Sequence, residues 1–295
     1  MGWLTILKRN VKSLNNAYVS DVRNSFIRND EQECLHRKME DLAGREARII
    51  KSIVDGTVLR TQKFENVLEV DYIVHWQHLI KQTNKFHIED KIEERRAIIS
   101  GDKLIDDYCL INEKILSSKQ PDVAERDYSE EELRFQYSRL EAVRYAERWW
   151  NDYNTVYKKF DDNCTNFISQ CLHAGGAPMA VGTSRSKGWW YRGNNWSFSW
   201  SVAHSLRWYL SGSKVGLRAI EVVKPEELIK GDVICYDFDG DGKWQHTTIV
   251  VAKDVNKMPL VNAQTTNSRM RYWAYEDSTA WTENIKYKFF HIADN

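Results

Sequence analysis

Residues 161–176 read DDNCTNFISQCLHAGG, and this stretch decides how the second half of the chain folds. Asp162 or Asn163 can cap a helix that begins at Cys164, and the two glycines at the end of the stretch are a natural stop. We therefore predict a helix of about ten residues. Its apolar face, at the spacing i, i+3, i+4 and i+7, comprises Cys164, Phe167, Ile168 and Cys171.

The thiol of Cys164 is a candidate nucleophile because it lies in the first turn of this helix. Backbone N–H groups are unpaired there, so they stabilise a thiolate and can face a developing oxyanion. A buried structural cysteine is the alternative for a thiol on an apolar face, and Cys171, in the middle of the helix, fits that alternative. A nucleophilic role for Cys164 also requires a base.

Three predicted antiparallel strands follow at 231–237, 244–252 and 259–265. His246 lies near the start of the second strand, and we predict that it is the base. Asn262 and Gln264 lie two residues apart on the third strand, so they share a face and either can orient the imidazole. A cysteine at a helix start, with histidine and an orienting residue on neighbouring strands, is the papain-like arrangement.

Four motifs carry a resemblance to a known family: DDNCTNFISQCLHAGG at 161–176, GDV at 231–233, QHTTIVV at 245–251 and PLVNAQTTN at 259–267. Together they resemble the putative amidase domain of bacilli and clostridia, which is similar to the NlpC/P60 and CHAP cysteine peptidases. The resemblance covers roughly residues 129–295. It implies a bacterial hydrolase that cleaves an amide bond, in a cell-wall-type (peptidoglycan) peptide, through a thioester acyl-enzyme.

By this resemblance Cys164 is the nucleophile and His246 is the base. The family pattern often carries a second histidine in the third strand, and here Gln264 stands at the matching position. An amide oxygen can accept a hydrogen bond from the imidazole, but it brings no charge to stabilise an imidazolium. The third role therefore stays open between Gln264 and Asn262.

Aromatic residues are frequent between the cysteine and the histidine, in a chain with 12 Trp and 14 Tyr. A single tryptophan is more often buried, but a cluster interspersed with glycine and asparagine favours a partly exposed wall for a peptide or glycan. The predicted substrate-binding residues are Tyr157, Trp189, Trp190, Tyr191, Trp196 and Trp200. Tyr157, just upstream of the cysteine, is also a candidate for stabilising the oxyanion.

The first half of the chain has a different pattern. Residues 3–43 show helical spacing, and strand-like segments follow with predicted turns at 55–56 and 100–102. This order predicts an α+β domain with a long helix and an antiparallel meander, of cystatin-like or NTF2-like build. The polar stretch 117–122 is the predicted linker. It divides the chain into an N-terminal α+β domain, 1–122, of unknown role, and an α+β papain-like domain, 123–295, whose first helix starts at the capping box 129–132.

Composition excludes several classes of function. Lys plus Arg and Asp plus Glu number 42 each, so the chain has no net positive charge that would attract nucleic acid. No stretch reaches the roughly 18 apolar residues of a membrane span. The first 20 residues lack the apolar core of a signal peptide, so we expect a cytoplasmic protein, or an extracellular one if a leader was removed. The five cysteines are odd in number and scattered, which predicts free thiols.

No cofactor and no metal are expected. The DFDGDG stretch at 237–242 matches the opening of a calcium loop, but its twelfth position is Thr248 rather than a bidentate glutamate. A polar hairpin tip is the favoured interpretation of this stretch. Oligomeric state cannot be inferred from these patterns.

Two other functions remain open beside hydrolysis. One is a module of the same fold that binds a peptide or glycan with weak or no catalysis, and Gln264 keeps that alternative open. The other is acyl transfer, which shares the thioester intermediate.

Overall fold

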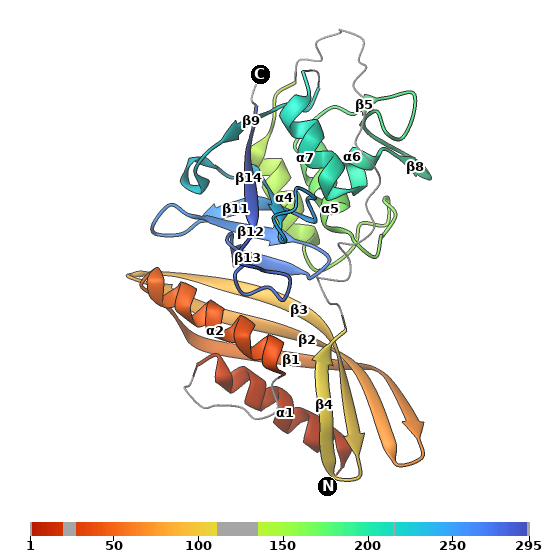
Figure 1. The fold of residues 1–295 in the computed structure, drawn as a ribbon, viewed down its shortest axis with the longest axis vertical. Coiled ribbons are helices and arrows are strands. Elements are labelled where there is room, and N and C mark those ends of the chain that lie inside the picture. The colour runs from red at the N-terminus through yellow and green to blue at the C-terminus, as the bar shows by residue number, and fades with distance from the viewer. Residues whose placement is uncertain (1, 20–27, 111–134, 215, 294–295) are drawn as a thin grey trace. The chain divides into compact units, whose positions relative to one another are not determined.

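A computed structural model describes the chain except for residues 1, 20–27, 111–134, 215 and 294–295. It divides into two compact units: Met1–Glu113 with Tyr275–Thr279, and Lys114–Ala274 with Ala280–Asn295. Each unit is mixed α and β (Figure 1). The predicted linker at 117–122, the domain boundary at 122–123 and the capping box at 129–132 lie outside the described residues. The prediction that the first helix of the second domain starts at 129–132 is wrong, because residues 135–138 are not helical and the helix begins at Arg139, where the Ser138 side chain accepts from the Glu141 amide.

The first unit pairs two helices with a four-stranded antiparallel meander. The elements are α1 (Trp3–Ala17), α2 (Asn29–Gly44), β1 (Ala47–Phe64), β2 (Val67–Gln82), β3 (Lys85–Ser100) and β4 (Lys103–Cys109). Each strand pairs antiparallel with the next in the chain. This is the meander that the strand-like pattern predicts.

One predicted turn in this unit is wrong and the other is confirmed. Asp55 and Gly56 lie inside β1, where Gly56 pairs with Val74. The long ladder with β2 outweighs the local turn preference of this dipeptide. The hairpin at 100–102 is confirmed, with Ser100 paired to Lys103 and Gly101 at a φ of 57°, which glycine adopts without strain.

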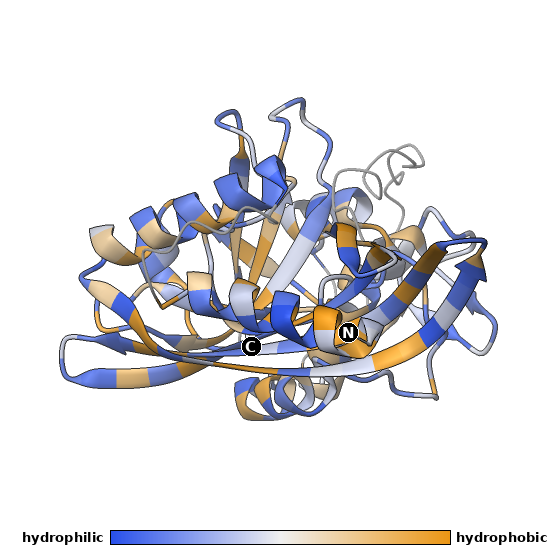
Figure 2. Ribbon diagram, turned by 90° about the horizontal axis from the view of Figure 1, so that it is seen from below, coloured by the Kyte–Doolittle hydropathy of each residue, from blue (hydrophilic) through white to orange (hydrophobic). Residues whose placement is uncertain are grey.

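Alternating side chains place the core of the first unit on one face of its strands. Figure 2 shows hydrophobic and hydrophilic residues alternating along the long strands. In β2 the residues Val70, Tyr72, Val74 and Trp76 are buried and pack with Leu7 and Leu14 of α1.

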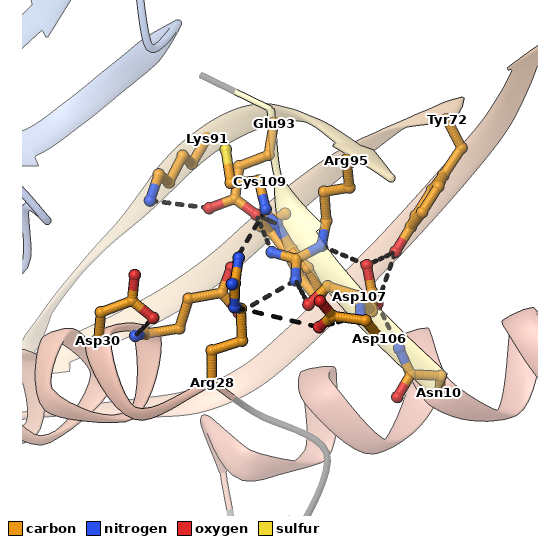
Figure 3. A network of polar contacts seen from close by, with 12 residues as sticks. Asn10, Arg28, Asp30, Tyr72, Lys91, Glu93, Arg95, Asp106, Asp107 and Cys109 are labelled. Carbon is orange, nitrogen blue, oxygen red and sulfur yellow. Dashed lines mark hydrogen bonds and ion pairs between the residues drawn. The ribbon is translucent and has the colours of Figure 1, made fainter. Parts of the chain in front are cut away.

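A charged network is also buried in this unit (Figure 3). Its centre is Arg95 of β3, which is 3 % exposed. The guanidinium forms ion pairs with Glu31 of α2 at 3.0 Å, Glu93 of β3 at 3.1 Å and Asp107 of β4 at 3.2 Å. Tyr72 of β2 donates to Asp107 at 2.8 Å. The network thus ties a helix to three neighbouring strands.

The second unit places helices against an antiparallel sheet. Its helices are α4 (Arg139–Trp149), α5 (Cys164–Ala174), α6 (Phe198–Ser201), α7 (Ala203–Gly212) and the 3-10 turn η1 (Pro225–Glu227). The sheet runs in the order β13 (Ser268–Tyr272), β12 (Pro259–Ala263), β11 (His246–Lys253), β10 (Val233–Asp237), β14 (Lys286–Ile292) and β9 (Ala219–Val222). Two small hairpins are β5 (Ala180–Val181) with β6 (Gly188–Trp189), and β7 (Tyr191–Arg192) with β8 (Asn195–Trp196). The predicted α+β class is confirmed.

The aspartate of the GDV motif is a structural anchor. Asp232 is fully buried and accepts hydrogen bonds from Arg139 Nη1 at 2.5 Å and from the Ile292 amide at 3.0 Å. His291 Nδ1 lies 2.9 Å from its other oxygen. One carboxylate therefore joins the start of α4 to the end of β14.

Within the described part of the chain, no helix is both long enough and apolar enough to cross a membrane.

Candidate active site

Helix α5 begins at Cys164, as the DDNC motif predicts, and ends at Ala174 just before the paired glycines. The thiol is 1 % exposed. Its Sγ donates a hydrogen bond to Asp162 Oδ1 at 3.3 Å and lies 3.6 Å from Thr165 Oγ1. The helix start therefore brings a thiol, a carboxylate and a hydroxyl together.

The cap of this helix comes from a residue that the sequence did not reveal. Asn163 is the N-cap residue of α5, but its side chain does not cap the helix. Instead Thr265, in the turn after β12, accepts from the backbone N–H of Asn163 at 2.9 Å and of Cys164 at 3.1 Å. Its hydroxyl donates to Asp162 Oδ1 at 3.1 Å. The polar stretch QTTN at 264–267 is the one sequence signal for a capping residue here.

Burial determines the protonation states of Cys164 and Asp162. It raises the pKa of the Cys164 thiol, and the negative charge of Asp162 raises it further, so the sulfur keeps its proton at rest. Burial also raises the pKa of Asp162, although hydrogen bonds from Cys164 and Thr265 work in the opposite direction. The thiol proton thus points to a carboxylate of increased basicity.

His246 is the first residue of β11, and its side chain lies on the other face of the sheet from α5. Thr247 Oγ1 lies 3.2 Å from Thr165 Oγ1 on the helix side. Successive side chains of a strand point to opposite faces, and the ring of His246 lies 5.6 Å from that of Tyr236, its neighbour on β10. The base role of His246 stays a prediction.

Burial gives His246 a pH-dependent role in stability. Burial first, and then the charge of Arg271, lower its pKa from 6.5 to about 3. Between these values the unfolded chain takes up a proton that the folded chain does not, so stability falls as the pH falls from 6.5 towards 3. At pH 5 the loss from His246 is about 2 kcal/mol. Urea unfolding of wild type and His246→Gln at pH 7 and pH 5 measures it, and an equal pH dependence in both would contradict it.

The two candidates for the third role bind elsewhere. Gln264 accepts a hydrogen bond from Asn163 Nδ2, and its own Nε2 donates to the carbonyl oxygens of Trp149 and Asp152 at 2.5 and 2.8 Å. Asn262 donates to Glu147 Oε1 at 2.9 Å and accepts from the Met270 amide at 2.9 Å.

Both amides therefore face α4 and α5 rather than His246, because Asn262 pairs with Ile249, which shares the face of Thr247. Gln264 contacts Asn163, the residue before Cys164, whereas Asn262 contacts α4 and β13. Neither orients the imidazole in this structure.

Comparison with known proteins places this site in a family. The model of the putative amidase domain matches residues 136–290, which include Asp162, Cys164, His246 and Thr265. The chain belongs to the putative amidase domain family. Membership suggests a hydrolase that acts on amide bonds.

Two relatives of the chain come from Bacillus subtilis (strain 168). The uncharacterized protein YhbB is 50% identical over 274 residues, which cover 88% of this chain and 86% of that protein. The uncharacterized protein YjcM is 28% identical over 216 residues, which cover 70% of this chain and 47% of that protein. No solved structure matches the chain at a significant level, so no structural comparison supports the predicted papain-like fold.

Half of the predicted aromatic wall belongs to the core of the amidase domain. Trp189 and Trp200 are fully buried and Trp190 is 5 % exposed. Their indole N–H groups find internal partners: Trp200 donates to Asn166 Oδ1 at 2.8 Å and Trp189 to Ser169 Oγ at 2.9 Å. Trp190 donates to the Lys187 carbonyl at 2.9 Å. For these three the expectation of an exposed wall is wrong, because each indole N–H has an internal acceptor that allows the ring to be buried.

The other half of the wall remains partly accessible. Tyr157, Tyr191 and Trp196 are half-buried, with ring centroids of Tyr157 and Tyr191 5.1 Å apart and those of Tyr191 and Trp196 6.0 Å apart. The ammonium of Lys158 and the guanidinium of Arg185 lie 5.0 and 4.9 Å from the Trp196 ring. Asn166 Nδ2 donates to the Lys158 carbonyl at 2.9 Å, which places this group beside the start of α5.

The acidic loop of the amidase domain is a hairpin tip. Asp237 accepts hydrogen bonds from the amides of Gly240 and Gly242, both at 2.8 Å, so its oxygens face N–H groups rather than a cation. In the portions of the chain that the structure describes, no group of three or more His, Cys, Asp or Glu could hold a metal ion. All five cysteines are free, as predicted.

Proposed function

We propose that the protein hydrolyses an amide bond with Cys164 as the nucleophile and a thioester acyl-enzyme as the intermediate. One observation carries this proposal: within the family-matched segment, the thiol at the start of α5 donates to the buried carboxylate of Asp162. The positive end of the helix dipole favours the negative charge that develops during attack.

Asp162 is the group best placed to take the thiol proton. It contacts Sγ at 3.3 Å, whereas His246 lies on the opposite face of the sheet. Because burial raises the pKa of Asp162, its carboxylate is a stronger base than a solvated one. In the proposed step sulfur bonds to the carbonyl carbon, its proton passes to Asp162, and the same proton then goes to the leaving amine. Water hydrolyses the thioester.

The accessible rings support a peptide substrate. Tyr157, Tyr191 and Trp196 offer apolar faces beside α5, and Lys158 and Arg185 bring positive charge to the same group. A peptide that carries a carboxylate, such as a cell-wall-type peptide, combines the features that this surface can bind.

Replacing each of the two candidate bases, Asp162 and His246, in separate variants tests the mechanism. Asp162→Asn is expected to lower kcat at least about 100-fold, because a general base is removed, while His246→Gln changes kcat by only a few fold. The assay incubates the full chain with plain peptides and peptidoglycan-derived peptides and measures the released amine by liquid chromatography and mass spectrometry. The reverse order of effects would restore His246 as the base.

A second function is favoured by the protonated thiol. Because burial raises the pKa of Cys164, a weakly catalytic or inactive module that binds the same peptides is the alternative. Calorimetric binding of a peptide from the panel, with no amine released from any of them, would support binding alone. Amine release that depends on Cys164 would exclude it.

A further inference from the structure

The hydroxyl of Thr265 uses its full capacity for hydrogen bonds. Its oxygen accepts from the N–H groups of Asn163 and Cys164, which occupy both lone pairs. The hydroxyl proton is then left for Asp162 Oδ1, at 3.1 Å. That same carboxylate oxygen accepts from the Cys164 thiol. Asp162 Oδ1 is therefore the acceptor in the hydrogen bonds from Thr265 and from the Cys164 thiol.

The backbone at Thr265 is held in an uncommon conformation. Its φ is 87°, in the left-handed region, where a β-branched residue is strained. Glycine would adopt this φ without strain, but it would carry no hydroxyl. The turn after β12 thus keeps a threonine in a strained backbone conformation, and its hydroxyl makes three hydrogen bonds with residues at the start of α5.

We propose that Thr265 is a positioning residue that holds the Asp162 carboxylate ionised and aimed at the thiol of Cys164. This inference rests on the proposed function, in which Asp162 accepts the thiol proton. The hydroxyl of Thr265 donates to Asp162, so Thr265 acts on the thiol through Asp162. Of the groups around Asp162, Thr265 and Cys164 are the ones whose hydrogen bonds lower its pKa, against the effect of burial.

The direct test is a titration of the Asp162 carboxyl carbon by 13C NMR in the full chain, with Asp162→Asn to identify its resonance. Thr265→Val keeps the β-branched shape and removes the hydroxyl, so the pKa of Asp162 is expected to rise by on the order of one unit. Thr265→Ser keeps the hydroxyl and is expected to titrate as wild type. An Asp162 titration that Thr265→Val leaves unchanged would overturn the inference.

Kinetics separate positioning from a structural cap. Thr265→Val is expected to lower kcat about tenfold with KM unchanged, and to move the acid limb of the pH–rate profile upward. Thr265→Ser is expected to restore both. If Thr265→Val does not fold, Thr265→Ala gives the same comparison without the bulk at Cβ. If Thr265→Val lowers stability but leaves the acid limb of the pH–rate profile in place, Thr265 only caps the helix and does not position Asp162.

Failure of this inference is distinguishable from failure of the proposed function. If Cys164→Ala keeps full hydrolysis, the proposed function fails whatever the titration of Asp162 shows. If Cys164→Ala is inactive and Thr265→Val matches wild type in titration and kinetics, the role of Thr265 alone fails.

Discussion

Cys164→Ala is expected to lower kcat for amide hydrolysis by more than about a thousandfold, because no other group can form the thioester in its place. The fold should survive, since the thiol is small and its loss removes one hydrogen bond to Asp162. The measurement is amine release from the best peptide of the panel, with circular dichroism to confirm folding.

The matched control is Cys171→Ala in the same helix. Cys171 is fully buried, so its replacement tests the cost of removing a buried sulfur without touching the site. We expect kcat within a few fold of wild type and a stability loss of about 1 kcal/mol. An equal loss of activity in both variants would point to helix packing and away from a nucleophile.

Arg95→Met is expected to destabilise the first unit by about 3–5 kcal/mol, the cost of breaking a buried ion pair. The substitution leaves Glu31, Glu93 and Asp107 without the guanidinium that they share (Figure 3). Lys91 still contacts Glu93 at 2.8 Å, but Glu31 and Asp107 lose their cation. Three carboxylates in one buried cluster repel one another, and this repulsion lowers the free energy of unfolding.

The neighbouring residue supplies the control. Arg96 pairs with Asp71, with 25 % of its side chain exposed, on the opposite face of β3. Arg96→Met should cost about 1 kcal/mol or less. Urea unfolding, followed by circular dichroism, compares the two. Equal costs would mean that the buried network adds no more to stability than the partly exposed Arg96–Asp71 pair.

Local sequence signals predict the central elements of the second unit. The helix at Cys164 follows from apolar spacing and the paired glycines, and β10, β11 and β12 follow from short apolar runs between turns. These features depend on residues close together in the chain. The cap of α5 does not, since Thr265 lies 101 residues from Cys164, and no local pattern links two such positions.

The face that His246 occupies could not be predicted for a related reason. A strand that is half-buried alternates polar and apolar residues, which reveals its inner face. In β11 the residues from His246 to Val251 are all buried, so the pattern carries no such signal. The position of α5 over Thr247 decides the face, and that contact arises only in the folded chain.

Tryptophan burial is equally hidden from the sequence. Trp189 and Trp196 occur seven residues apart in the same aromatic stretch, yet the first is fully buried and the second is half-buried. The Trp189 indole donates to Ser169 of α5, and this contact between distant residues is not visible in the sequence. An aromatic cluster therefore predicts a region of interest but not which of its rings meet a ligand.

The central claim is that Cys164 becomes acylated during amide hydrolysis. Rapid acid quench of the full chain with an excess of a cleavable peptide, followed by proteolysis and mass spectrometry, locates the acyl group. The account predicts an acyl mass on the peptide that contains Cys164, present in wild type and absent in Cys164→Ala. Steady release of amine with no acyl group on Cys164, and at an unchanged rate in Cys164→Ala, would contradict it.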